Sequence, residues 1–279
     1  MMKMQYTLIP FSKYVYALVS RQKNKKIDFF IIGAQKCGTT SLHDYMNQHP
    51  FCTGALRKET LFFTKKYRGT VTLERLVGHF SFKKLMRNRG KCLFFESTPD
   101  NVYEEAAPGR IYKYNPKAKL IFLVREPVSR AISEYNMACK YAIVKNLCVR
   151  EDPEREYFDY LRQPDKYPFE WFVKEEFRRM EETGSRLPSA FHYPDFIRHG
   201  LYSEQLERYL QYFSPEQILI LESKSLKTDK RNTLSAIEDF LELPHHEWSE
   251  KDECKLFLKK YFEPWNEKFF ELIGRRMDW

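Results

Sequence analysis

The stretch at residues 29–42 constrains the fold more than any other part of the chain. Four apolar residues, 29–32, are followed directly by Gly33, a pattern typical of a buried, parallel strand that ends in a tight loop. A second glycine, Gly38, precedes a Thr-Thr-Ser sequence that can open a helix. Backbone N–H groups of the loop, the positive end of the helix dipole and the charge of Lys36 would then converge on an anion. The stretch therefore predicts a site for a phosphate or sulfate ester.

The order of residues in this loop distinguishes between classes of phosphate site. In the phosphate loop of nucleoside triphosphatases, a lysine and then a serine or threonine follow the second glycine, and the hydroxyl binds Mg²⁺. Here Thr39 follows Gly38, and Lys36 lies inside the loop. This order disfavours a Mg·ATP site and hence a P-loop kinase. A strand–turn–helix corner with a solvated lysine is the other interpretation of the stretch taken alone.

The loop resembles the 5′-phosphosulfate loop of the sulfotransferases that use 3′-phosphoadenosine-5′-phosphosulfate (PAPS), which also carry a lysine inside a Gly-Thr-Thr loop. The resemblance implies that six consecutive residues contact the nucleotide: Lys36, Cys37, Gly38, Thr39, Thr40 and Ser41. Lys36 is also implied to be catalytic, because its charge would neutralise the phosphate from which the sulfuryl group departs.

A second motif, at residues 120–135, supports the resemblance. Five apolar residues, 120–124, predict a central strand, and Pro127 suits the first turn of a following helix. In the family, the arginine at this strand end and a serine eight positions later bind the 3′-phosphate of the donor, and Arg125 and Ser133 match them. A guanidinium gives bidentate recognition of phosphate, and a hydroxyl adds a neutral donor. In isolation, an arginine paired with a carboxylate at a helix start would explain the motif as well.

The predicted helix after Pro127 carries apolar residues at helical spacing. Three of them are expected to share one face: Val128, Ile132 and Tyr135.

A candidate base lies between the two motifs. Glu59 follows Arg57 and Lys58 and precedes the apolar residues 61–63. From these residues alone, a solvated ion pair is favoured over a positioned base. Heparan-type carbohydrate sulfotransferases carry a similar segment, and the resemblance implies that Glu59 takes the proton of the sulfate acceptor.

Two segments depart from the family pattern. Residues 91–95 predict a buried strand that runs into a loop of the kind where α/β sites assemble. The family usually has a lysine in that loop, after a glutamate that Glu96 matches, whereas this chain has Ser97. Residues 244–260 replace a disulfide hairpin and a Lys-Gly-Arg segment that often cap the nucleotide. Three lysines are candidates to substitute for this cap: Lys255, Lys259 and Lys260.

Residues 197–202 resemble the family segment that lies close to the nucleotide. Tyr202 is therefore either a residue that lines the adenine or acceptor side, or plain packing. The helix expected after it carries apolar residues at helical spacing that predict core packing: Leu206, Tyr209, Leu210 and Phe213. Residues 218–222 predict another buried strand.

Composition limits the class of protein. The 279 residues, 43% of them hydrophobic, suffice for one large α/β domain, and the net charge of +9 favours anionic ligands such as nucleotides or acidic glycans. Six cysteines without a CxxC pair indicate neither a zinc site nor a redox motif, so a reduced, cytoplasmic setting is expected.

The N-terminal segment at residues 7–19 is interrupted by Pro10 and Lys13 and is too short for a spanning helix. We therefore expect neither a transmembrane segment nor a signal peptide there.

Together these features predict an N-terminal extension at residues 1–26 and one domain at residues 27–279. The expected fold is α/β, with a central, mostly parallel sheet, helices on both faces and a P-loop-related sulfotransferase topology. The resemblance implies sulfuryl transfer from PAPS to an acceptor hydroxyl or amine, leaving adenosine 3′,5′-bisphosphate, with no metal and no nucleic-acid partner. A carbohydrate is the favoured acceptor; a small metabolite or natural product, or a non-catalytic nucleotide- or glycan-binding relative, is the alternative.

Overall fold

The computed structural model describes residues 25–64, 67, 69, 71, 79–81, 83–88, 91–145, 155–184, 195–248 and 253–277. The chain divides after His245 into two compact units. Because residues 1–24 lie outside the described residues, the predicted boundary between residues 26 and 27 stays a prediction.

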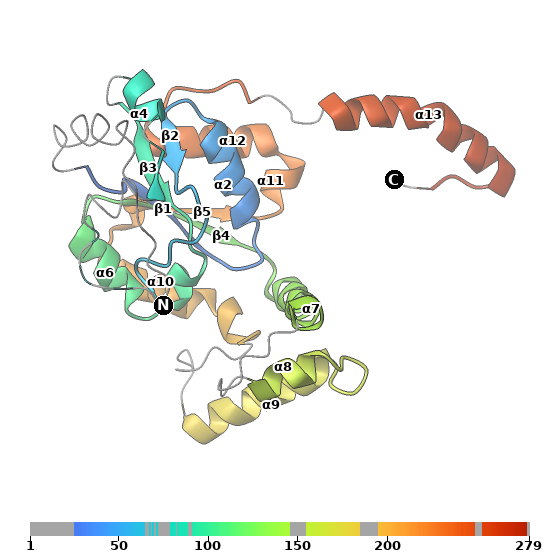
Figure 1. Cartoon of the computed structure of the whole chain (residues 1–279), viewed down its shortest axis with the longest axis horizontal. Helices are drawn as coiled ribbons and strands as arrows, with labels where there is room; N and C mark the ends of the chain where they lie inside the picture. The colour runs from blue at the N-terminus through green and yellow to red at the C-terminus, as the bar shows by residue number, and fades with distance from the viewer. Residues whose placement is uncertain are drawn as a thin grey trace, which may run out of the picture. The chain divides into compact units, whose positions relative to one another are not determined.

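The first unit is built on a parallel, five-stranded sheet in the order β2-β3-β1-β4-β5 (Figure 1). Its strands are β1 (Phe29–Gly33), β2 (Cys52–Gly54), β3 (Leu93–Glu96), β4 (Lys119–Val124) and β5 (Ile218–Glu222). The connection from β1 leads toward β2 on one side of the sheet, and the connection from β3 crosses back over β1 to β4 on the other side, so the strand order reverses between β1 and β4. In α/β sheets such a switch point, at the carboxyl ends of the strands, is where ligands bind. The predicted α/β fold is confirmed.

Helices cover both faces of this sheet (Figure 1). One face carries α2 (Thr39–Gln48), α11 (Ser225–Thr228) and α12 (Lys230–Leu241), and the other carries α6 (Ala107–Tyr114) and α10 (Tyr202–Leu210). The short helix α5 (Asp100–Tyr103) contacts β1, α6 and α10. The crossover from β1 to β2 and the crossover from β3 to β4 run in opposite directions, and right-handed crossovers therefore place their helices on opposite faces. The other helical segments of this unit are α4 (Lys83–Arg87), α7 (Pro127–Lys145), α8 (Arg155–Leu161), α9 (Phe169–Thr183), η1 (Arg198–Gly200) and η2 (Pro215–Gln217).

The core of the sheet lies around β1, whose five residues are all buried. β5 forms as predicted, but the expectation that it is a buried strand is wrong. It has a partner strand on one side only, and Ile220 is 47% exposed. In α10, Leu210 is 44% exposed, so it does not belong to the predicted core, whereas Tyr209 and Phe213 do.

The buried side of α7 differs from the predicted one. Val128 and Ile132 are 60% and 42% exposed, and only Tyr135 of the three apolar residues is buried. Two charged residues, Arg130 and Glu134, take the buried face instead. Next to them, α7 packs with α8 and α9 through a cluster of buried residues: Ala131, Tyr135, Cys139, Ala142, Leu161, Phe172 and Phe196.

The second unit contains α13 (Glu253–Ile273), which includes Pro264. The side chains of Lys255, Lys259 and Lys260 lie outside the described part of the chain, so their role as a substitute cap stays a prediction. No helix among the described residues combines the length and the apolar character that a membrane crossing requires.

Candidate active site

The loop after β1 has the backbone geometry of an anion site. Gly38 has φ +88°, in the left-handed region that favours glycine, and it precedes the first residue of α2. No side chain caps α2 within the described structure, so the first N–H groups of this helix have no intrahelical partner. A Cβ at Gly33 would approach Val102 Cγ1 to 2.4 Å, and only glycine fits there. The loop therefore packs closely on α5 and presents N–H groups at the switch point.

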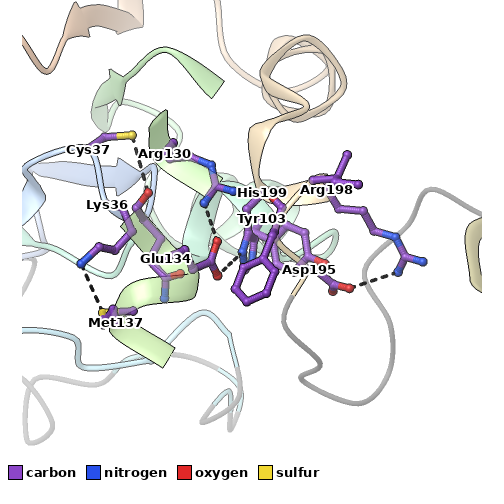
Figure 2. A network of polar contacts seen from close by, with 12 residues as sticks. Lys36, Cys37, Tyr103, Arg130, Glu134, Met137, Asp195, Arg198 and His199 are labelled. Atoms are coloured by element: carbon purple, nitrogen blue, oxygen red, sulfur yellow. Dashed lines mark hydrogen bonds and ion pairs between the residues drawn. The ribbon is translucent and has the colours of Figure 1, made fainter. Parts of the chain in front are cut away.

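Lys36 is available for an anion. Its side chain is half-buried, and its Nζ contacts Met137 Sδ, a weak acceptor, at 3.4 Å (Figure 2). Among the described residues Lys36 forms no ion pair with a carboxylate. A cation held in this way at a loop rich in N–H groups can bind a phosphate oxygen.

Arg125 follows the end of β4 and is half-buried. The neighbouring carboxylate, Glu126, accepts the backbone N–H groups of Val128 and Ser129 at 2.8 and 2.6 Å, and hydrogen bonds from Ser129 hold the pKa of Glu126 below its usual value. Glu126 thus caps α7, and Arg125 has no carboxylate partner in the described part of the chain. The ion pair that would have explained Arg125 without a ligand is not formed. Ser133 lies half-buried on α7, as predicted.

Tyr202 joins the two loops. Its hydroxyl donates to the carbonyl of Arg125 at 2.9 Å, accepts the N–H of Arg125 at 3.4 Å and lies 3.6 Å from Cys37 Sγ. Its ring packs edge-on against Phe122 of β4 at 5.7 Å between centroids. Burial raises the pKa of Tyr202, so the phenol stays protonated. The sequence left open whether Tyr202 packs or lines a site. In the structure Tyr202 bonds the backbone of Arg125 and contacts the side chain of Cys37, and so links the two predicted phosphate sites.

Glu59 lies on a loop that hydrogen bonds hold to the end of β3. Its carboxylate is 50% exposed and pairs with Lys58 at 2.8 Å, the ion pair that the sequence favours. The next residue, Thr60, donates its N–H and its hydroxyl to Glu96 Oε1, at 3.2 and 3.0 Å. Glu96 ends β3 and is fully buried. The loop that carries Glu59 is therefore tied to the same edge of the sheet as Lys36 and Arg125.

Glu96 is a residue whose importance the sequence did not reveal. Besides Thr60, it accepts the hydroxyl of Thr98 and, at 2.8 Å, the amide of Asn101. Burial raises the pKa of Glu96, and these hydrogen bonds oppose the rise. Ser97, where the family has a lysine, is fully buried, and its hydroxyl has no partner among the described residues. The missing cation is therefore not replaced by Ser97.

A cavity of about 410 Å³ borders the Glu59 loop. It lies between α2, residues 53–58 and the start of α4. Eight of its eleven lining residues are polar or charged, namely Thr40, His43, Asp44, Asn47, Thr53, Lys58, Ser81 and Lys84, and the other three are Gly54, Ala55 and Leu56. Lys84 donates to the carbonyls of Asn47, His49 and Cys52 and so is committed to the fold. No phenylalanine, tyrosine or tryptophan of the described chain lines this cavity. Its hydroxyl and amide groups suit a ligand with many hydroxyls.

Comparison with known proteins agrees with this geometry. A Dictyostelium discoideum protein named membrane-associated sulfotransferase kil1 is 27% identical, over 90% of this chain and 66% of that protein, so the chain spans about two thirds of its length. Heparan sulfate glucosamine 3-O-sulfotransferase 5 of Mus musculus is also 27% identical, over 89% of this chain and 72% of the relative. The solved structure of a sulfotransferase from Alicyclobacillus acidocaldarius has the same fold, with a TM-score of 0.55 at 24% identity, over 91% of this chain and 98% of that one. The family model described as "Sulfotransferase domain" matches residues 26–263, and the chain belongs to that family.

Proposed function

We propose that this protein transfers a sulfuryl group from PAPS to a hydroxyl or amine of a carbohydrate. The observation that carries the proposal is the position of Tyr202, whose hydroxyl contacts both Cys37 of the first loop and the backbone of Arg125. Two half-buried cations without carboxylate partners in the described chain, Lys36 and Arg125, thus belong to one hydrogen-bonded unit. A nucleotide with phosphates at both its 5′ and 3′ positions fits such a pair of sites.

Each of the two loops would bind a different phosphate group of the donor. Lys36 and the free N–H groups at the start of α2 would hold the 5′ phosphosulfate, and Arg125 with Ser133 would hold the 3′-phosphate. The 3′-phosphate contacts would select PAPS over adenosine nucleotides that lack this group.

The transfer needs a base and a place for the departing charge. The acceptor oxygen or nitrogen forms a bond to sulfur while the bond from sulfur to the 5′-phosphate oxygen breaks, and the electron pair of that bond stays on the phosphate. Lys36 would neutralise this charge, and Glu59 would take the proton of the acceptor. As in phosphoryl transfer, positioning and electrostatic stabilisation supply most of the rate enhancement.

The cavity beside the Glu59 loop supports a carbohydrate acceptor. Its lining offers hydroxyl, amide and carboxylate groups, and Lys58, which pairs with Glu59, forms part of its wall. Relatives whose names refer to heparan sulfate and the net charge of +9 favour an acidic glycan. A small metabolite with several hydroxyls would meet the same groups.

Calorimetric titration with adenosine 3′,5′-bisphosphate, adenosine 5′-phosphate and Mg·ATP tests the donor. We expect a clear preference for the bisphosphate that is lost in Arg125→Ala. Binding of Mg·ATP as tight as that of the bisphosphate, or no nucleotide binding by folded protein, would refute the proposal. Release of the bisphosphate from PAPS, measured with a desulfated heparan acceptor and with a simple phenol, then tests transfer. Tight binding without release on any acceptor would indicate a nucleotide-binding relative instead.

A further inference from the structure

A buried network of charged and polar side chains includes Arg130 and Glu134 of α7, the helix that also carries Ser133. We call it the α7–η1 network. Its members come from α5, α7, α9 and the segment of η1: Tyr103, Arg130, Glu134, Glu176, Asp195, Arg198 and His199.

Glu134 is at the centre of this network (Figure 2). Its Oε2 lies 2.5 Å from Arg130 Nη1, and its Oε1 lies 2.8 Å from His199 Nδ1. Arg130 is fully buried and also donates to the carbonyl of Phe196. A buried carboxylate whose two oxygens face two cations is strongly held, since loss of either partner would leave a charge without compensation.

The bond between Glu134 and His199 connects the two elements that build the predicted 3′-phosphate site. Ser133 precedes Glu134 on α7, and Tyr202 follows His199 by three residues. Tyr202 in turn holds the N–H and the carbonyl of Arg125. Arg125 and Ser133 are therefore joined twice, directly through the start of α7 and a second time through Tyr202, His199 and Glu134.

We propose that His199 and Glu134 are a positioning pair for the 3′-phosphate: their hydrogen bond holds α7 and the Tyr202 segment at the spacing in which Arg125 and Ser133 reach the same phosphate. The inference rests on the proposed function, because it assigns a role in binding that nucleotide. Neither residue of the pair needs to touch it.

Titratable groups from the neighbouring elements surround His199. These are Arg130 and Glu134 of α7, Tyr103 of α5, whose ring centroid lies 3.9 Å from that of His199, Glu176 of α9, and Asp195 of its own segment, which also pairs with Arg198. Although burial opposes it, the carboxylate of Glu134 raises the pKa of His199. The ion pair between His199 and Glu134 is therefore fully formed at and below the ordinary pKa of histidine. It weakens as pH rises through the higher pKa that His199 has in the folded state.

The readout is a ratio: the affinity for adenosine 3′,5′-bisphosphate divided by that for adenosine 5′-phosphate. Contacts of Lys36 with the 5′-phosphate cancel in this ratio. We expect His199→Ala to lower it about tenfold, within the range of coupling between residues of one network. His199→Gln keeps a neutral donor for Glu134, as unprotonated histidine does, so its ratio should exceed that of His199→Ala and match that of the wild type at high pH. His245→Gln is a matched control, since His245 also bonds a glutamate, Glu238, at 2.9 Å.

The control pair lies at the end of α12, near the amino edge of the sheet, where Lys119 of β4 bonds the carbonyl of Phe240. The ratio is measured from pH 6 to pH 9 for the wild type and for His199→Gln, because ionisation of the 3′-phosphate affects both proteins alike. We expect the wild-type ratio to fall relative to that of His199→Gln as His199 loses its proton. The second ionisation of a phosphate monoester, at a pKa of about 6, would act in the opposite direction.

The outcomes separate this inference from the proposed function. If the wild type does not prefer the bisphosphate, both are refuted. If the wild type prefers it and His199→Ala keeps the ratio, or loses affinity for both nucleotides equally, the positioning role is refuted and the proposed function stands. A wild-type ratio that follows the same pH course as that of His199→Gln would also refute the role, including where His199→Ala does not fold.

Discussion

Replacement of Glu96 tests whether the loop that carries Glu59 must be held in place for transfer. Glu96 is fully buried and accepts four hydrogen bonds, from Thr60 N and Oγ1, from Thr98 Oγ1 and from Asn101 Nδ2. Glu96→Ala removes all four acceptor contacts. Glu96→Gln keeps the oxygen that accepts from Thr60 and replaces the other oxygen by an amide nitrogen.

The two variants differ in expected stability. At roughly 1 kcal/mol for each hydrogen bond, Glu96→Ala should lose about 4 kcal/mol of unfolding free energy. For a unit of this size that corresponds to a fall of about 10 °C in Tm. In Glu96→Gln, Asn101 can turn its amide so that its Oδ1, which is buried and has no partner in the described structure, accepts from the new nitrogen. One buried donor then loses its acceptor, which costs about 1 kcal/mol.

The two variants should also differ in activity. A displacement of about 1 Å in a reacting group can cost about 10²-fold in rate, so we expect kcat of Glu96→Ala to fall by about that factor. Glu96→Gln should stay within a few-fold of the wild type. Both variants should bind adenosine 3′,5′-bisphosphate normally, because neither Lys36 nor Arg125 bonds Glu96. Thermal unfolding, calorimetry and the rate of transfer from PAPS measure these effects. A wild-type kcat in Glu96→Ala, or equal losses of affinity and kcat, would contradict the argument.

Two further predictions concern other carboxylates. Glu59→Gln should lower kcat by about 10² to 10⁴-fold, the usual contribution of a general base, with nucleotide affinity unchanged by calorimetry; a normal kcat would exclude Glu59 as the base. Burial raises the pKa of Glu176 to about 7, so the folded state binds its proton more tightly than the unfolded state does. Stability should therefore decrease as pH rises from about 4.5 to 7, by at most about 3 kcal/mol from this group, and Glu176→Gln should remove that decrease in urea unfolding measured across the range. Parallel curves for the two proteins would contradict the assignment.

Elements of the fold were predictable where the signal is local. β1 and β4 are uninterrupted apolar runs, and Gly33 and Pro127 mark where the chain turns into loop or helix. Burial was less predictable, because it depends on partners that are distant in sequence. The buried face of α7 contains Arg130 and Glu134 since their charges compensate each other and His199, which is 65 residues from Glu134. No local pattern indicates that compensation.

The same distinction applies to the candidate site: a residue with a local sequence signal was predictable, and a residue that acts through distant partners was not. The positions of Lys36 and Arg125 in the fold were predictable, because each lies in the loop after a recognisable strand. The role of Tyr202 was not, because its hydroxyl reaches Cys37 and Arg125 across 165 and 77 residues. Glu96 was visible only as the end of a strand, since its main partner, Thr60, is 36 residues away.

The cationic side chains of this unit form two groups that differ in burial and in ion pairing. One group stabilises the fold, and the other is available to bind a ligand. Arg130 and Arg198 are buried and paired, with Glu134 and Asp195, at distances of 2.5 and 3.5 Å. A buried guanidinium requires such a partner, because the loss of hydration would otherwise be uncompensated. Lys36 and Arg125 are only half-buried, and the nearest acidic side chain to Arg125 in sequence, Glu126, is committed to capping α7. A cation that keeps part of its hydration and has no fixed partner can exchange water for an anion at low cost. That difference is why we propose that a doubly phosphorylated nucleotide binds at Lys36 and Arg125 rather than at the buried arginines.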